Sequence, residues 1–266
     1  MKNTQNLPDP FFTPFEERVN SVDIPERFTY PFDYRPNLLS LLAVKKLQAY
    51  LTSWQDLNHN FGLSKSDGAV IGKMFGVLIV KTEEGQIGYL SAFSGKLGGS
   101  NHHKGFVPPI FDGVEKGGFL NRGMLELAGL CTEIKRLESL PVIDHGLQIS
   151  KLKESRKAFS NALQQQIFEQ YSFLNQYGDK RSLRFIFDQA DYKNPPAGAG
   201  ECAAPKLLQY AFQHRMKPVS MAEFWWGLSP KSDTWKHGNF YPACLEKCAP
   251  ILGHMLSGIA LDERTG

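Results

Sequence analysis

The chain has 266 residues, of which 42% are hydrophobic and 21% are charged, and its net charge is +3. This composition excludes a disordered protein, and the length suits one large domain, since a single hydrophobic core grows to roughly 250 residues. No apolar run reaches the ~20 residues of a membrane span, and four cysteines are too few for a disulfide scaffold. We therefore expect a cytoplasmic protein without membrane contact. The mild positive charge permits an acidic partner such as RNA.

The first 36 residues predict an extended arm that docks on the rest of the chain. Prolines recur throughout this segment and oppose regular helix or central strand. Seven aromatic residues supply apolar anchors for docking: Phe11, Phe12, Phe15, Phe28, Tyr30, Phe32 and Tyr34.

The body of the protein is predicted to consist of residues 37–118 and 178–266. Apolar residues at three- and four-residue steps predict a first helix that begins at Asn37 and ends by Gly62. Two short apolar segments, Lys73–Val80 and Gln86–Phe93, then predict a β-hairpin. The glycine-rich stretch Ser94–Gly118 that follows predicts a long loop.

Residues 119–177 predict a long antiparallel helical pair, of coiled-coil type, inserted into the body. Two apolar stripes at helical spacing are separated by a break at Pro141 and Gly146. The remaining body elements are predicted to be a strand at Leu183–Phe187, a helix from Pro205 to about His214, a strand at Lys217–Trp226 and a helix at Ala243–Ser257. Without the helical pair, this order predicts an α/β fold, or an α+β fold, with a mixed sheet flanked by helices.

Three cysteines form the sharpest candidate site. Cys202 precedes the penultimate helix, and Cys244 and Cys248 lie four residues apart at the start of the last helix. Residues i and i+4 share a helix face, so this pair can direct two sulfurs at one point, and Cys202 supplies a third ligand for tetrahedral zinc. The candidate fourth ligand is His237, with His254 or water as alternatives. A second interpretation is that all three cysteines are small buried residues without a metal.

This order of elements resembles that of the zinc-dependent nucleobase deaminases. In that family one helix begins at the first metal ligand, and a later helix begins with a Pro-Cys-x-x-Cys pair. A glutamate two residues after the first ligand transfers protons, but Ala204 stands at that position here, and the cysteine pair is spaced C-x₃-C. Glu201 and Glu223 are near in sequence, and no pattern assigns either to the role. The resemblance therefore predicts a deaminase-like order of elements more strongly than a deaminase activity.

Basic residues cluster along and after the second long helix, where they could contact RNA phosphates. The candidate RNA-binding residues are Lys151, Lys153, Arg156, Lys157, Lys180, Arg181 and Arg184. The alternative is a solvated helix face that binds no nucleic acid.

Six sequence blocks resemble, in order, the region that precedes the catalytic domain in long bacterial pseudouridine synthases of the RluA family. The blocks are Lys73–Val80, Gly88–Gly95, Gly105–Pro109, Pro195–Phe212, Met221–Gly227 and Tyr241–Leu252. The resemblance extends from about Ile24 to Gly258. It implies an accessory region that binds ribosomal or transfer RNA for a pseudouridine synthase catalytic domain, in cis or in trans.

The resemblance carries over no catalytic residue. Enzymes of this family use an aspartate in a His-Arg-Leu-Asp type motif, without metal or organic cofactor, whereas Arg136-Leu137 here is followed by Glu138. The chain ends about where that catalytic domain begins in the family. We therefore expect the accessory region alone, as part of a longer protein or as a separate gene product. Two alternatives stay open: a zinc-dependent deaminase-like domain, active or inactive, and a protein-interaction module that uses the helical pair.

Overall fold

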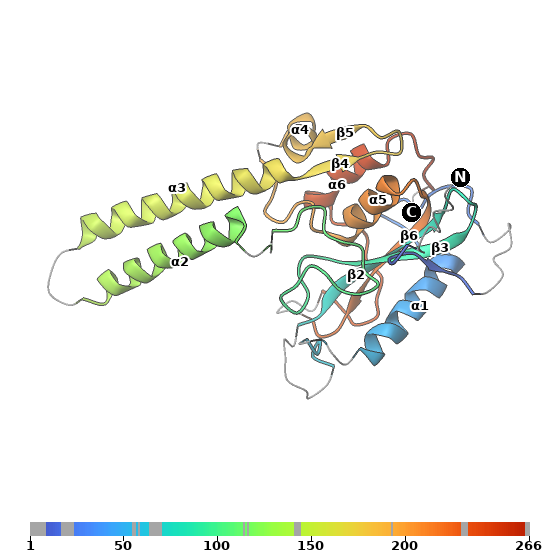
Figure 1. The fold of residues 1–266 in the computed structure, drawn as a ribbon, viewed down its shortest axis with the longest axis horizontal. Coiled ribbons are helices and arrows are strands. Elements are labelled where there is room, and N and C mark those ends of the chain that lie inside the picture. The colour runs from blue at the N-terminus through green and yellow to red at the C-terminus, as the bar shows by residue number, and fades with distance from the viewer. Residues whose placement is uncertain are drawn as a thin grey trace, which may run out of the picture.

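The computed structural model describes residues 9–16, 24–54, 57, 59–63, 71–113, 115, 117–140, 145–192, 194–229 and 234–263. These residues form an α/β body from which two long helices project to one side (Figure 1). The main sheet has the strand order β1-β3-β2-β6, and each described pairing in it is antiparallel. Its strands are β1 (Thr13–Pro14), β2 (Lys73–Lys81), β3 (Ile87–Phe93) and β6 (Lys217–Trp226).

Helices cover both faces of this sheet. Strand residues alternate between the faces, so Val77 and Ile79 of β2 pack with helix α1 (Leu38–Ser53). Leu78 and Val80 face the other side, where helices α5 (Ala203–Gln213) and α6 (Leu245–Met255) lie next to each other (Figure 1). The predicted α/β class, with a sheet flanked by helices, is confirmed. The main sheet is antiparallel rather than mixed, because its described strands pair with neighbours that run in the opposite direction. Within the described residues, none of the helices is long and apolar enough to cross a membrane.

Strand β6 lies at the edge of the sheet, and other segments occupy its free hydrogen-bonding groups. The hydroxyl oxygen of Thr29 accepts from the Met221 N–H at 3.2 Å, and that of Tyr34 accepts from the Glu223 N–H at 2.8 Å. Farther along the chain, the Tyr241 N–H donates to the Glu223 carbonyl at 3.0 Å. The arm and the segment before α6 therefore protect this edge from pairing with another chain.

The arm contacts the body at both ends of its described length. β1 approaches β3 so closely that a Cβ at Gly88 would lie 2.5 Å from the Phe12 ring, so glycine is needed there. Phe28 is buried, its N–H donates to the Ala260 carbonyl at 2.8 Å, and its carbonyl accepts from the Asp262 N–H at 2.8 Å. The arm therefore pairs with the last described residues of the chain.

The projecting part is formed by α2 (Phe119–Glu138) and α3 (Gly146–Gln170), which run antiparallel (Figure 1). Two long helices thus stand where the sequence predicts a helical pair, and Pro141, at the predicted break, lies outside the described residues. The buried residues of the two helices are few: Gly123, Ile134 and Leu137 on α2, and Leu163 and Phe168 on α3. The pair is therefore thinly packed along most of its length.

Two predicted elements differ from the structure. Leu183–Phe187 is not a strand but the start of helix α4 (Leu183–Gln189), because the Ser182 hydroxyl caps the helix by accepting from the Phe185 N–H at 3.2 Å. The first helix ends at Ser53, well before the predicted limit at Gly62. A separate two-stranded sheet, β4 (Ser172–Leu174) with β5 (Lys180–Ser182), connects α3 to α4.

Candidate metal centre

Three cysteines from two neighbouring helix starts meet at one point. Cys202 and Cys244 are the N-cap residues of α5 and α6, and Cys248 lies one turn into α6. Their three sulfurs all lie within 4.8 Å of one another, and those of Cys244 and Cys248 are 3.4 Å apart. Sulfurs that share a tetrahedral zinc ion with Zn–S bonds of about 2.3 Å are roughly 3.8 Å apart. The cluster therefore has the dimensions that a zinc ion needs.

The charges of these thiols depend on one another. Hydrogen bonds with Cys202 and Cys248 hold the pKa of the Cys244 thiol far below its usual value. The hydrogen bond with Cys244, together with burial, raises the pKa of Cys202. Hydrogen bonds with Cys202 and Cys244, together with burial, raise the pKa of Cys248. The positive ends of the α5 and α6 dipoles also favour a thiolate at their N-caps. The shared hydrogen bonds and the two helix dipoles thus favour a thiolate in this cluster, and a divalent cation could replace the remaining thiol protons.

Neither candidate histidine belongs to this group of atoms. His237 Nδ1 accepts from the Gly227 N–H at 2.9 Å, and its ring lies against Trp226. His254 follows Cys248 by six residues on α6, and its Nε2 bonds the Phe173 carbonyl at 3.0 Å. The structure therefore brings together three of the four predicted ligands. His237 is not among them, because its ring nitrogen is hydrogen-bonded to the loop that follows β6.

Glu223 lies beside the cluster and is buried, with 4% of its surface exposed. Its Oε1 accepts from the Ala204 N–H, in the first turn of α5, at 3.3 Å. Burial raises the pKa of its carboxyl group to about 8, and the charge of Cys244 adds to this rise. Sequence reasoning did not assign Glu223 a role, since only the position of β6 under the start of α5 brings its side chain here.

The Glu223 backbone is held by two tyrosines. The Tyr34 hydroxyl accepts from the Glu223 N–H and donates to the Tyr241 carbonyl at 3.2 Å. Hydrogen bonds therefore join the arm, the strand β6 and the segment that precedes α6. Burial and the Glu223 charge raise the pKa of Tyr34, which keeps its hydroxyl protonated. The predicted arm is thereby part of the structure that positions the candidate site.

A second polar group lies one turn farther along α5. Lys206 is 4% exposed, and its Nζ donates to the Phe93 and Gly95 carbonyls at 2.9 and 3.1 Å. With Glu201 and Tyr171, it lines a cavity of about 110 Å³. The Tyr171 hydroxyl donates to Glu201 at 3.4 Å, which ties α5 to the base of the helical pair.

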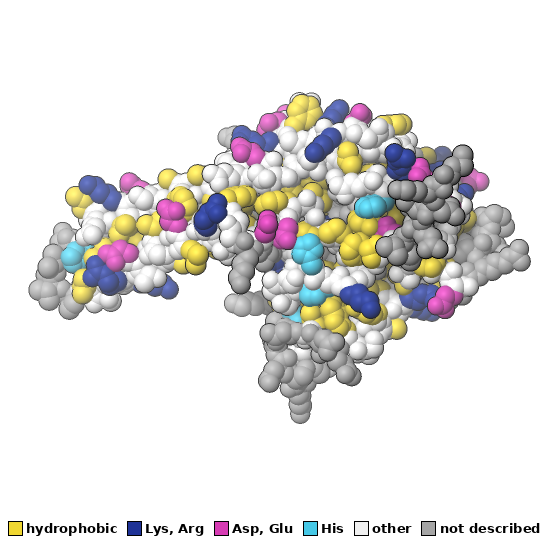
Figure 2. Space-filling model, viewed as in Figure 1, with side chains coloured by type: hydrophobic (Ala, Val, Ile, Leu, Met, Phe, Trp, Pro, Cys, Tyr) yellow, Lys and Arg dark blue, Asp and Glu magenta, His cyan; other side chains and the backbone are white. Residues whose placement is uncertain are grey.

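The candidate RNA-binding residues fall into two separate groups. Lys151, Lys153, Arg156 and Lys157 lie near the projecting end of α3, whereas Lys180, Arg181 and Arg184 lie on β5 and α4. All seven are exposed. Lys157 lies about 20 Å along the helix from the end of α3 at Gln170, at a rise of 1.5 Å per residue, and the second group follows that end of the helix. In the view of Figure 2, Lys and Arg side chains are interspersed with Asp and Glu over both the body and the helical pair.

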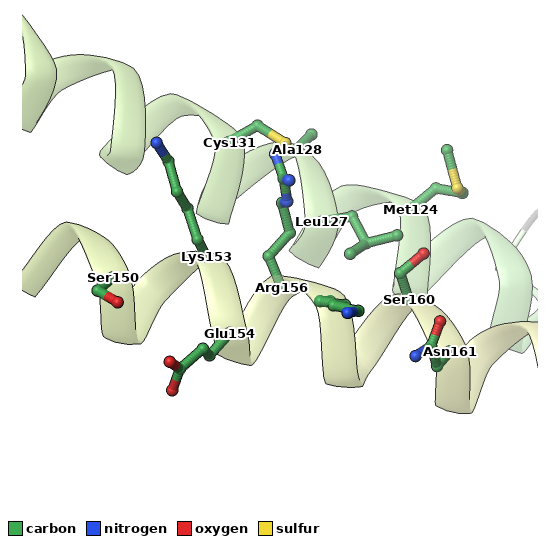
Figure 3. A pocket seen from close by; sticks show the side chains of 11 residues that line it. Met124, Leu127, Ala128, Cys131, Ser150, Lys153, Glu154, Arg156, Ser160 and Asn161 are labelled. Carbon is green, nitrogen blue, oxygen red and sulfur yellow. Dashed lines mark hydrogen bonds between the residues drawn. The ribbon is translucent and has the colours of Figure 1, made fainter.

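The group on α3 borders an open groove of about 770 Å³ between the two helices. Lys153 and Arg156 reach from α3 toward α2 (Figure 3). The Lys153 ammonium pairs with Glu138 at 2.8 Å, and the Arg156 guanidinium lies 3.9 Å from the Cys131 sulfur. Part of this basic group is therefore engaged within the helical pair.

Comparisons with known proteins find no family model, no curated protein and no solved structure that matches this chain.

Proposed function

We propose that this chain is a zinc-binding accessory region that binds RNA beside an RluA-type pseudouridine synthase catalytic domain, in cis or in trans. It does not isomerise uridine itself. The observation that carries the proposal is the three-cysteine cluster between α5 and α6. Its cysteines lie in Pro195–Phe212 and Tyr241–Leu252, two of the blocks that carry the resemblance to the accessory region.

The zinc part of the proposal is supported by the sulfur geometry. Three thiols converge from two helix starts, and Cys131, the remaining cysteine, lies apart on α2. Helix starts stabilise thiolates, which are the form that binds metal. A zinc ion at this point would join the start of α5 to the first turn of α6.

The RNA part of the proposal is supported by the projecting helical pair. Exposed basic residues near its end could reach phosphates at a distance from the body, and each such contact would add salt-dependent affinity. Lys153 and Arg156 also interact with α2. The four basic residues of this group therefore set the upper limit on the number of phosphate contacts that it can make.

Zinc content tests the first part. Protein purified without chelator should contain about one equivalent of zinc, since one group of three converging thiolates binds one ion. Cys244→Ser should lose that zinc, and Cys131→Ser, the matched control on α2, should retain it. Zinc below about a tenth of an equivalent in the native protein would exclude the site.

Salt-dependent RNA binding tests the second part. Replacing Lys151, Lys153, Arg156 and Lys157 together by Ala should lower the slope of log affinity against log salt by up to about four charges' worth. A control with the same loss of charge replaces four exposed lysines of the body: Lys45, Lys81, Lys104 and Lys217. A helical-pair variant that binds structured RNA like the control would remove this surface from the proposal.

A deaminase-like hydrolysis is the second candidate function, and the position of Glu223 favours it. The Glu223 carboxylate lies at the N–H of Ala204, the residue that stands where the deaminases have their glutamate. A buried carboxylate can therefore reach the start of α5 from the neighbouring strand.

A further inference from the structure

We infer that Glu223 hydrogen-bonds a water molecule at the fourth position of a metal ion held by Cys202, Cys244 and Cys248, so that this centre is open and binds water or a small anion. The inference rests on the proposed zinc site and adds the nature of its fourth ligand.

The cysteine cluster offers a metal ion three protein ligands. Within the described residues, the group of metal-ligating atoms contains three sulfurs and no histidine or carboxylate. A zinc site with three protein ligands keeps a fourth position for water or substrate, whereas a closed structural site has four protein ligands. Cys244 is exposed, so the cluster has one side that solvent can reach.

The surroundings of Glu223 leave its carboxyl group with unused hydrogen-bonding capacity. A Cβ at Gly76 would lie 3.4 Å from the Glu223 Cγ, and 3.0 and 3.2 Å from the Ala203 and Leu207 side chains, so these groups share one small, mostly apolar space. No ion pair among the described residues includes Glu223. A carboxylate offers about four acceptor sites, and burial is costly unless they are used. One hydrogen bond of 3.3 Å from Ala204 leaves capacity for a further polar partner.

The Glu223 carboxyl group is held at the start of α5. Ala204 follows Cys202 by two residues at the start of α5, so its N–H fixes the Glu223 carboxylate next to the cluster. The carboxylate oxygens are not among the atoms that lie within 4.8 Å of one another. Glu223 is therefore placed to contact the metal through an intervening water rather than as a direct ligand.

A purely structural role for Glu223 is the competing explanation. Cys202 makes no side-chain capping hydrogen bond, so the orphan Ala204 N–H is satisfied by Glu223 instead. Glu223→Gln separates the two roles, because the amide oxygen of glutamine can still accept from Ala204 but carries no negative charge. The effect of this variant on a ligand at the metal is therefore the decisive readout.

The experiment uses the full chain loaded with cobalt(II), whose visible spectrum reports thiolate ligation and coordination number, with azide as the probe. Azide should change the cobalt bands of the native protein by displacing water. At pH 9, above the pKa of about 8 of the Glu223 carboxyl group, Glu223→Gln should retain the thiolate-to-cobalt bands and bind azide about tenfold more tightly, since the negative carboxylate no longer opposes an anion. Glu201→Gln, the exposed glutamate next to Cys202, is the matched control and should bind azide like the native protein.

Each other outcome has a separate meaning. A native protein without thiolate-to-cobalt bands overturns the zinc proposal together with this inference. Thiolate bands that azide does not change show a closed centre, and overturn the inference alone. Azide affinity that is equal in the native protein and in Glu223→Gln shows that the carboxylate only caps α5, and overturns the role of Glu223.

Discussion

Lys206 places an ammonium group in the interior of the body. Its Nζ donates to the carbonyls of Phe93 and Gly95 and lies 5.0 Å from the centre of the Phe93 ring. These contacts compensate only part of the lost hydration, so burial lowers the pKa of Lys206 to about 8, against the opposing attraction of Glu201. Because the pKa of Lys206 differs between the folded and the unfolded chain, the free energy of unfolding must depend on pH.

The free energy of unfolding should rise with pH between about 8 and 10.5 in the native protein relative to Lys206→Met. In this window the unfolded chain still binds the lysine proton that the folded chain has released, and stability rises wherever the unfolded state binds more protons. The rise amounts to about 3 kcal/mol for a shift of this size. Denaturant unfolding of both proteins at a series of pH values measures it, and parallel curves would contradict it.

Residue types and spacing were enough to predict the three-cysteine group, because Cys244 and Cys248 share one face of one helix. They were not enough to predict Glu223 or Tyr34. Glu223 reaches the group only because β6 pairs with β2 under the start of α5, and Tyr34 only because the arm follows the edge of β6. Such contacts depend on strand register and chain path, which local spacing does not encode.

Apolar runs and apolar stripes predicted most of the elements correctly. The hairpin, the strand at Lys217–Trp226 and the two helices of the projecting pair all stand where the sequence indicates. Leu183–Phe187 shows the limit, since five mostly apolar residues suit a buried strand and a short helix equally well. The deciding signal was Ser182, whose hydroxyl caps the helix, and it lies just outside the apolar run.

Two glycines of α2 test how this helix is packed. A Cβ at Gly129 would meet no atom within 4 Å, whereas one at Gly123 would lie 2.7 Å from a Leu163 methyl group on α3. Gly129→Ala should stabilise α2 by about 0.5–1 kcal/mol through helix propensity alone. Gly123→Ala should lose that gain, because Leu163 must move.

Hydrogen exchange of the α2 amides measures both variants against the native protein. Gly129→Ala should slow exchange along the helix, and Gly123→Ala should not. Equal slowing by the two substitutions would mean that the contact between Gly123 and Leu163 is loose.

The junction between α5 and α6 lies in the larger core cluster of the body. Both helices contribute to the core cluster on one face of the sheet, and the three cysteines connect their first turns. A metal that binds only the folded chain stabilises it by mass action, by about 2.7 kcal/mol at a hundredfold excess over its dissociation constant.

Removal of zinc by a chelator should therefore lower the Tm by roughly 5–10 °C for a protein of this size. Cys244→Ser should show the lower Tm from the start and no further change with chelator, while Cys131→Ser should respond like the native protein. Differential scanning calorimetry measures the three proteins, and a native Tm that chelation leaves unchanged would show that no metal supports this junction.

The pairing of Phe28 with Ala260 and Asp262 also has a mechanical consequence. A pulling force on the last described residues is transmitted through these backbone hydrogen bonds into the arm, which continues to Tyr34 and so to the Glu223 backbone. The last described residues are thereby connected, through the arm, to the backbone of Glu223. Tension that separates Phe28 from Leu261 would remove a contact that holds the arm, and with it Tyr34, against the body.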